Sequence, residues 1–290
     1  MAVPQSVKNH IQELKEEYER LKIDKSSLLQ IIDEAEIPEL VFNSNAIENS
    51  ALTLKETEDI LLEMDVSKNI SVREIFEAKN LARIIEYIRS KLHELDVNKE
   101  TILFFHEMLI GNIEDKIAGR FREKDEYVRV GSFIALPPEH IEKVIGEILI
   151  EYKSNHNKYF IEKIAKFHLD FENIHPFVDG NGRIGRVLIN LQLQQIGFPG
   201  IVIRNKGKKE YYKSFGIYRD NKDMKHMEKI IALALSESLH KRIAYLKSMN
   251  IIPVVKYAKT DGRSIQTLLN AAKRQTISAF REKGVWKIGV

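Results

Sequence analysis

The sequence predicts an all-α protein that carries one short β-hairpin and a small C-terminal unit. Gly and Pro, which most often interrupt helices, number only 14 and 7 in 290 residues. Apolar residues recur at spacings of three and four over most of the chain, as in amphipathic helices. Residues 111–137 are the exception, because they contain glycine and alternate locally between apolar and polar side chains.

The composition is that of a folded soluble protein, with 43% hydrophobic and 30% charged residues. A net charge of +3 is too small to indicate wholesale nucleic-acid binding. The absence of cysteine excludes a disulfide framework and thiolate chemistry. No secretory signal opens the chain, and no stretch approaches the roughly 18 apolar residues of a membrane span. We therefore expect a cytoplasmic protein with no membrane partner.

The first part of the chain is expected to form separate helices. Apolar residues at three- and four-residue spacings mark the first, and Pro38 then interrupts the pattern. Thr53 and Glu56 form a capping box that opens another helix. The helices expected in this part cover residues 7–21, 53–62, 72–92 and 98–109.

The middle of the chain is expected to form a hairpin and then more helices. The alternating run from Tyr127 to Ile134 predicts a short hairpin. Helical patterns resume at Pro138, and Gly197 and Pro199 supply one clear stop. The helices expected here cover residues 138–152, 161–171, 184–196, 208–219 and 224–248.

The last forty residues look like a separate small unit. Between Ser264 and Trp286 the pattern favours two short helices joined near residues 270–275, as in a helix-turn-helix. Such a unit is either a nucleic-acid reader or an appendage used for packing or protein binding. The predicted organisation is a helical region over residues 1–95, a core over 96–248 and the small unit over 249–290.

The segment from Asp179 to Arg186 carries the clearest chemistry. Gly180 and Gly182 flank Asn181, so the backbone can turn tightly and approach a ligand closely. The backbone amides then point outward at a helix N-terminus, which favours an anion. Arg183 and Arg186 add guanidinium groups, whose forked donors match phosphate oxygens.

Two further side chains fit a phosphate site. Asp179 offers a hard oxygen ligand for Mg²⁺, which commonly bridges one carboxylate and substrate phosphates. His175 is the nearby group with a pKa close to neutral, as a general base requires. A plain turn or half of a calcium loop are the alternatives. Too few acidic ligands and two adjacent arginines argue against calcium, whereas a triphosphate explains both signs of charge.

These residues resemble a known family. His-Pro-Phe-x-Asp-Gly-Asn-Gly-Arg-x-x-Arg, from His175 to Arg186, resembles the Fic signature at every defined position. Residues 168–175 are similar to the family's approach helix. Gly119–Arg122, followed by Val128–Pro138, is similar to the flap that positions the modified hydroxyl. The resemblance covers roughly residues 40–245 and implies a Fic-type helical core that moves AMP from ATP onto a protein hydroxyl.

The resemblance also implies a role for each residue of the signature. His175 would deprotonate a Ser, Thr or Tyr hydroxyl, which attacks the α-phosphorus of ATP while pyrophosphate leaves. Asp179 would hold Mg²⁺ between the α- and β-phosphates, and Arg186 would hold the γ-phosphate. Phe177 would point into the core. The nucleotide-binding segment and its anion hole would comprise Gly180, Asn181, Gly182, Arg183 and Gly185.

Two segments outside the signature complete the implied site. Tyr211 and Tyr212 would lie near the adenine, although paired tyrosines as often only pack. Arg120 and Arg122 either support the flap or pair with nearby acids. His106 shows no metal-ligand spacing and is interpreted as structural or solvent-facing. His168 lies on an apolar helix face and is interpreted as a core histidine, with a second base as the alternative. The flap residues implied to line the site are Val128, Arg129, Val130 and Gly131.

The segment from Ser44 to Asn49 resembles the family's inhibitory motif, Ser/Thr-x-x-x-Glu-Gly/Asn. Without that resemblance, Ser44 is an ordinary helix N-cap and Glu48 an ordinary surface acid. A carboxylate delivered by a short helix would pair with Arg186 and take the place of the γ-phosphate. ATP would then bind with its α-phosphate misaligned, and an error of about 1 Å can cost roughly 10²-fold in rate.

The predicted function is therefore protein adenylylation held at low activity by Glu48. Three alternatives stay open: removal of AMP from a modified protein, with Glu48 orienting a water; transfer of UMP or another phosphate-linked group; and a DNA-binding regulator built on residues 250–290. The implied partner is a protein with a hydroxyl side chain, which includes the chain itself. A homodimer is also expected by analogy with the family.

Overall fold

The computed structural model describes residues 3–62, 70–131 and 133–290, and it is mostly helical. Nine of the described helices, α1 and α3 to α10, match the expected positions to within about three residues, and the all-α prediction is confirmed. Among them, none is long and apolar enough to cross a membrane. The α-helices are α1 (Gln5–Leu21), α2 (Ser26–Ile47), α3 (Leu54–Leu61), α4 (Val72–Lys91), α5 (Lys99–Ile110), α6 (Pro138–Ser154), α7 (Phe160–Ile174), α8 (Asn181–Gln195), α9 (Lys208–Asn221), α10 (Lys225–Leu246), α11 (Val254–Asp261) and α12 (Ile265–Lys273).

Local sequence signals explain several helix boundaries. The Thr53 side chain accepts from the Glu56 amide while Glu56 reaches back to Thr53, which completes the predicted capping box of α3. Ser71 and Glu74 form the same box at the start of α4. At the end of α8, Gly197 adopts a φ of 76°, a conformation that glycine takes without strain.

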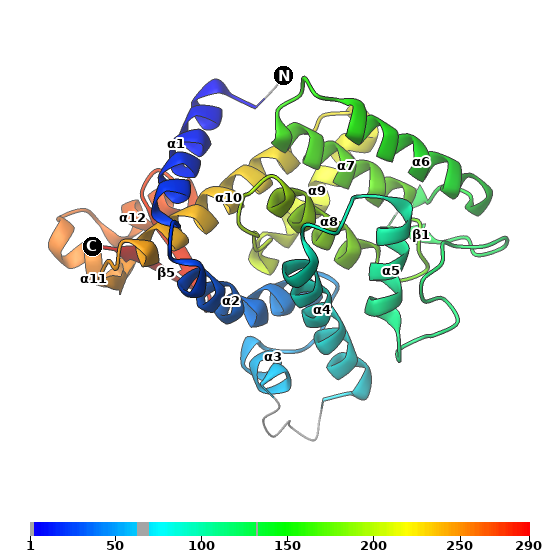
Figure 1. Ribbon diagram of the computed structural model, residues 1–290, viewed down its shortest axis with the longest axis horizontal. Coiled ribbons are helices and arrows are strands. Elements are labelled where there is room, and N and C mark those ends of the chain that lie inside the picture. Colours follow the sequence, from blue (N-terminus) through cyan, green and yellow to red (C-terminus); the bar gives the residue numbers. More distant parts are fainter. Residues whose placement is uncertain (1–2, 63–69, 132) are drawn as a thin grey trace.

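The helices α7 and α8 lie between two hydrophobic clusters. One cluster includes Phe171 and Ile184, and the other includes Leu169 and Ile189, so both helices are covered on opposite sides. Figure 1 shows α4, α5 and α6 on one side of this pair and α1 and α10 on the other. Because the pair is held from both sides, the loop between α7 and α8 is anchored at both ends.

The expected break at Pro38 is wrong, because α2 runs without interruption from Ser26 to Ile47. Proline removes one helical hydrogen bond, but burial of Ile37, Val41 and Ile47 on the protein core offsets that loss. The uninterrupted α2 changes the position expected for residues 44–49. Ser44 is not a helix N-cap but lies in the last turn of a 22-residue helix, and Glu48 is the residue that caps its C-terminus.

Two small antiparallel sheets complete the fold. The predicted hairpin consists of β1 (Arg129–Val130) and β2 (Phe133–Ile134), and Ser132 in its turn lies outside the described residues. The C-terminal sheet is formed by β3 (Ile251–Pro253), β4 (Ala279–Glu282) and β5 (Val285–Gly289), in the order β3-β5-β4.

The helix junction predicted near residues 270–275 is in the wrong place. The two short helices, α11 and α12, are joined at residues 262–264, and a β-hairpin follows α12. The tight junction depends on Gly262, whose φ of 80° ends α11, and on Ser264, whose hydroxyl caps α12. The division of the chain into three domains stays a prediction.

Candidate active site

The signature loop is held by its own side chains. The Asn181 side chain accepts from the Phe177 amide and donates to the Phe177 carbonyl, both at 2.8 Å. His175 ends α7 in a left-handed conformation, with a φ of 51°. A non-glycine residue in this region carries a strain cost that the surroundings must hold in place. The loop therefore has one defined shape before any ligand arrives.

His106 supports the loop from α5. Its ring stacks on Phe177, with the ring centres 3.7 Å apart, and its Nε2 lies 3.1 Å from the Asp179 carbonyl. The Gly119 amide donates to its Nδ1 at 3.1 Å, so His106 is neutral with the proton on Nε2. Burial lowers its pKa to about 4, which keeps that state at neutral pH. Phe177 is fully buried, as predicted.

His175 is placed to accept a proton. Burial lowers its pKa to about 4, opposed in part by the backbone of Glu172. The imidazole is therefore neutral at pH 7, and a neutral imidazole has a lone pair available for a general base.

Arg122 joins the loop to the flap. This side chain is 3% exposed, and it donates to the carbonyls of His175 at 2.8 Å and Leu136 at 2.7 Å. It also donates to the Glu126 carbonyl at 2.8 Å. One guanidinium thus fixes the backbone of the candidate base and both arms of the flap. Arg120, in contrast, pairs with the Glu126 carboxylate at 2.7 Å.

Asp179 is an ionised carboxylate at the loop's outer side. Burial acts to raise its pKa, but the charge of Arg183, the hydrogen bond from the Gly180 amide and the charge of Arg73 together outweigh that effect. The pKa of Asp179 is therefore lowered. Its Oδ1 accepts from Arg183 at 3.1 Å, and its Oδ2 accepts from Arg73 of α4 at 2.6 Å.

The donor set fits magnesium only in a substrate complex. No group of three or more His, Asp or Glu that would hold a metal by itself occurs among the described residues. Asp179 is the carboxylate of the signature loop, and its side chain is 39% exposed. Mg²⁺ commonly takes one carboxylate and completes its shell with phosphates and water, and the ionised Asp179 suits that arrangement.

The first turn of α8 leaves little room for side chains. Gly180 has a φ of 86°, and a Cβ there would meet a methyl carbon of Leu109 at 3.0 Å. At Gly182 a Cβ would lie 2.2 Å from a carboxylate oxygen of Glu48. The Glu48 carboxylate therefore lies directly against the helix N-terminus where a phosphate is expected.

Arg186 binds the end of α2 through three contacts. Its Nε donates to the Ser44 hydroxyl and its Nη2 to the Ser44 carbonyl, both at 2.9 Å. Its Nη1 lies 2.9 Å from Glu48 Oε1. The predicted pair of Glu48 and Arg186 is thus present in the structure. Arg186 is 5% exposed, which strengthens its interaction with a carboxylate relative to a surface pair.

Other residues of the segment 44–49 are held by α9. The Tyr212 hydroxyl donates to the Ile47 carbonyl at 3.1 Å and lies 3.4 Å from Glu48 Oε2. Lys208 donates to the Asn49 side chain at 2.6 Å. Both contacts hold the end of α2 on the candidate site.

Tyr211 and His168 lie beneath the site, away from its surface. Tyr211 is 1% exposed, and its hydroxyl lies 2.8 Å from His168 Nε2. The Tyr211 hydroxyl thus lies 3.4 Å from Arg186 Nη1, and its ring is covered by the protein. Burial lowers the pKa of His168 to about 3, as in a neutral core histidine. A Cβ at Gly185 would meet this ring at 2.8 Å, so glycine allows the close approach of α7 and α8.

Glu172 was missed by the sequence analysis. It is buried on α7, and burial, together with the charge of Glu48, raises its pKa to about 8. It is therefore protonated at pH 7.

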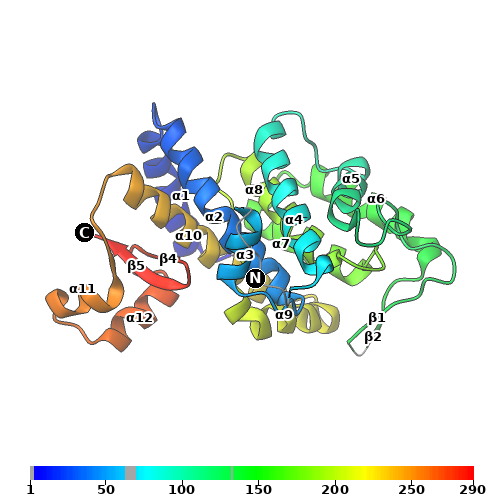
Figure 2. The ribbon, with the colours of Figure 1, turned by 90° about the horizontal axis from the view of Figure 1, so that it is seen from below.

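The flap is a short exposed hairpin. Ala135 donates to the Val128 carbonyl at 3.0 Å, and Arg129 donates to the Gly131 carbonyl at 3.0 Å. Arg129 and Gly131 are exposed, and Val130 is half-buried. Figure 2 shows β1 and β2 at the edge of the molecule, away from the body of helices.

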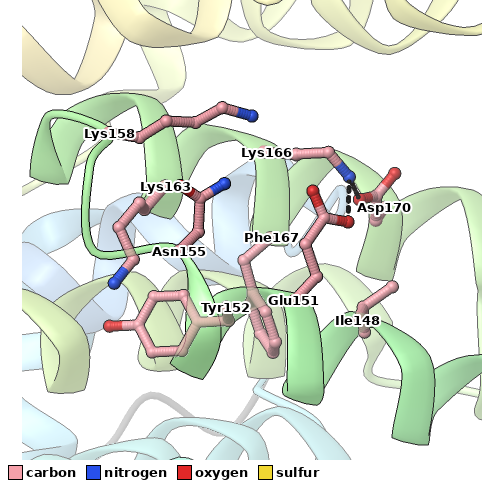
Figure 3. Close-up of a pocket in the computed structure, with 9 residues that line it drawn as sticks. All are labelled: Ile148, Glu151, Tyr152, Asn155, Lys158, Lys163, Lys166, Phe167 and Asp170. Carbon is pink, nitrogen blue, oxygen red and sulfur yellow. Dashed lines mark hydrogen bonds and ion pairs between the residues drawn. The ribbon is translucent and has the colours of Figure 1, made fainter.

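A pocket between α6 and α7 has no part in the loop chemistry (Figure 3). Its cavity measures about 20 Å³, which holds little more than one water. Lys166 faces it, but this lysine is already paired with Glu151 at 2.7 Å and Asp170 at 2.6 Å. We assign the pocket no function.

The part of the chain that contains the signature loop is similar to a known protein family. Residues 96–193 match the model of the Fic/DOC family. The matched span contains the whole signature loop, the flap and His106.

Two curated proteins resemble the chain well beyond the Fic domain. Protein adenylyltransferase fic-1 of Caenorhabditis elegans is 29% identical over 214 residues, which are 72% of this chain and 41% of that protein. Protein adenylyltransferase Fic of Drosophila melanogaster is 26% identical over 254 residues, 84% of this chain and 50% of that protein. The chain thus spans about half the length of the curated relatives or less.

Solved structures share the fold. A Fic domain containing signaling protein from Bacteroides thetaiotaomicron superposes with a TM-score of 0.74 at 23% identity, covering 82% of this chain and 97% of that one. Fic-1 (residues 134–508) from C. elegans gives 0.71 at 25% identity, covering 82% and 71%. A Fic family protein from Desulfovibrio desulfuricans gives 0.70 at 20% identity and covers all of this chain and 97% of that one.

Proposed function

We propose that this Fic domain protein transfers AMP from ATP to a hydroxyl side chain of a protein and that Glu48 holds it at low activity. The observation that carries the proposal is the position of His175. A neutral imidazole stands at the end of α7, next to a helix N-terminus with two glycines and a buried arginine. Relatives named protein adenylyltransferase over 72–84% of the chain support the same activity.

The proposed reaction uses the chain's residues as follows. His175 accepts the proton of the target hydroxyl, and the oxygen attacks the α-phosphorus of ATP. A phosphoester to AMP forms, the bond to the β-phosphate breaks, and pyrophosphate leaves. Amides at the first turn of α8 donate to the phosphate oxygens, and Arg186 binds the γ-phosphate once Glu48 releases it.

Magnesium, when bound, would neutralise phosphate charge and orient the triphosphate, with Asp179 as its protein ligand. Arg73 now pairs with Asp179 Oδ2, and its own side chain is 54% exposed. An exposed ion pair of this kind contributes only about 0–1 kcal/mol, so a metal–triphosphate complex can displace it.

The inhibitory role of Glu48 follows from shared space. Its carboxylate pairs with Arg186 and lies against Gly182, so a triphosphate and Glu48 compete for the same donors. A negative charge at this position also repels the γ-phosphate. We expect removal of this carboxylate to raise transfer, because the phosphates regain both Arg186 and the helix N-terminus.

An autolabelling assay tests the function. Wild type, Glu48→Gly and Glu48→Gln are incubated with ATP labelled at the α- or the γ-phosphate in the presence of magnesium. We expect covalent α-label on both variants, much less on wild type, and none from γ-label. Label from the γ-phosphate would replace AMP transfer with phosphoryl transfer.

The same assay separates the alternatives. Absence of label on all three proteins, with ATP binding retained, would contradict the proposal. Loss of AMP from pre-modified protein on adding wild type, but not Glu48→Gly, would then favour removal of AMP. Label from UTP at higher yield than from ATP would identify a different transferred group.

A further inference from the structure

The C-terminal unit has the topology of a winged helix. Strand β3 leads into α11 and α12, which are joined by three residues, and the hairpin of β4 and β5 follows. The strands pair in the order β3-β5-β4, and the unit has its own apolar cluster that includes Val254 and Leu268. In helix-turn-helix readers the second of two such helices enters the major groove of DNA.

We propose that residues 250–290 bind double-stranded DNA, with the exposed face of α12 in the major groove and nearby lysines on the phosphate backbone. This activity is separate from the chemistry at His175. The proposal is argued from the type, charge and exposure of side chains in residues 250–290, which lie outside the span matched by the family model.

The exposed face of α12 carries side chains that read bases. Leu268, Ala271 and Ala272 are buried and turn one face of the helix inward. Gln266 and Asn270 lie on the opposite face one turn apart, and their amides form a 3.1 Å hydrogen bond. Gln and Asn are the side chains that pair in bidentate fashion with adenine. A helix of about 10–12 Å diameter fits the roughly 12 Å major groove.

The unit is strongly basic, unlike the rest of the chain. Residues 250–290 contain eight Lys and Arg against two Asp and Glu, a charge of +6 in a chain whose total is +3. The remaining residues therefore carry −3. A concentrated positive charge on a small unit is the electrostatic footprint of a nucleic-acid reader.

Several of these cations have no acidic partner. Within the part of the chain that the structure describes, no ion pair is formed by four exposed side chains on α11 and at the end of α12. The four are Lys256, Lys259, Lys273 and Arg274. By contrast, Arg263 pairs with Asp261 at 2.5 Å. Unpaired cations are free to displace counterions from phosphates, which is the main source of DNA affinity.

The basic surface extends from α12 onto α10. A groove of about 1050 Å³ is lined by Lys273 and Arg274 on one side and by Lys229 on the other. Glu228 is the acidic side chain in its lining. Figures 1 and 2 show α11 and α12 at one end of the molecule, with no other element outside them. A duplex can therefore approach this end without meeting the rest of the protein.

The hairpin of β4 and β5 does not take part. The amides of Lys283 and Gly284 in its turn donate to the buried Glu39 of α2 at 3.3 and 3.0 Å. Lys283 also pairs with Glu58 at 3.0 Å. The hairpin is thus fixed to the core, and DNA contacts must come from α11 and α12.

Fluorescence anisotropy with a labelled duplex of random sequence tests the proposal on the full-length chain without ATP. We expect non-specific binding with a Kd of about 10⁻⁴–10⁻⁶ M at physiological salt. Removing Lys256, Lys259, Lys273 and Arg274 together, each to Ala, should weaken binding by at least tenfold and lower the salt slope by about one for each cation. The matched control removes four exposed lysines elsewhere, Lys55, Lys116, Lys143 and Lys158, and should bind like wild type.

Equal binding by the basic variant and wild type would overturn the proposal, and so would equal losses in both quadruple variants. Tighter binding to duplex RNA than to duplex DNA would also overturn it, because the RNA major groove is too narrow for α12. Circular dichroism and urea unfolding establish that the variants are folded. His175→Ala should bind DNA like wild type, so failure of the proposed transferase would leave this test intact.

Discussion

Arg122 is predicted to be the most sensitive position outside the signature. Its side chain is 3% exposed and donates to three backbone carbonyls at 2.7–2.8 Å, those of His175, Glu126 and Leu136. Arg122→Ala leaves all three acceptors without this donor. At about 1 kcal/mol for each buried acceptor, the low end of the range, the loss of folding free energy is about 3 kcal/mol.

Urea unfolding measures that loss, and Arg120→Ala is the matched control. Arg120 lies two residues away, but its side chain is 28% exposed and its ion pair with Glu126 is on the surface, so its loss should cost below about 1 kcal/mol. In the Glu48→Gly background, Arg122→Lys should lower kcat more than it raises KM for ATP, because His175 is displaced. Equal stability of Arg122→Ala and Arg120→Ala would refute the role of Arg122 in holding loop and flap together.

The geometry of the site leads to four further predictions. Transfer by Glu48→Gly should be independent of pH between about 6 and 8 and fall only toward pH 4, because the His175 pKa is lowered to about 4; a midpoint near 6.5 would contradict that environment. The same lowered pKa means that His175 contributes stability above pH 6.5 that is lost as pH falls toward 4. Gly180→Ala should cost about 1–3 kcal/mol in thermal or urea unfolding, through its φ of 86° and the Leu109 contact, whereas Gly216→Ala, with open space around it, should not destabilise. Ser44→Ala should raise transfer about tenfold, because a hydrogen bond to the charged Arg186 contributes about 1.5 kcal/mol to holding α2; unchanged transfer with unchanged ATP affinity would count against the docking of α2 as the brake.

Local sequence signals predicted the helices well because their causes are local. The box at Thr53 and the glycine stop after α8 each involve residues within one turn of each other. The break expected at Pro38 was wrong because distant segments of the chain bury the apolar side chains of α2. The free energy of that burial outweighs the loss of one helical hydrogen bond. The helix junction of the C-terminal unit was misplaced because both short helices were expected after Ser264, whereas α11 ends at Asp261, before that segment begins.

The candidate site also contains residues that the sequence predicted and residues that it did not. The signature from His175 to Arg186 is contiguous, so its residues and the pairing of Arg186 with Glu48 were predicted. The supporting residues were not: Arg73 and His106 reach the loop from α4 and α5 across the fold. Arg122 was left as one of two possibilities, because nothing in its neighbourhood along the chain shows that it points inward. Tertiary packing decides such contacts, and a single sequence carries no spacing rule for them.

We propose that His175 is the base of an AMP transferase released by removing Glu48. The decisive measurement is the rate of α-label incorporation in Glu48→Gly compared with Glu48→Gly/His175→Ala, at ATP concentrations that saturate both. We expect the rate to fall by about 10²-fold or more in the double variant with an unchanged Kd for ATP, the range expected for loss of a general base. Equal rates in the two proteins, with ATP bound equally well, would contradict it.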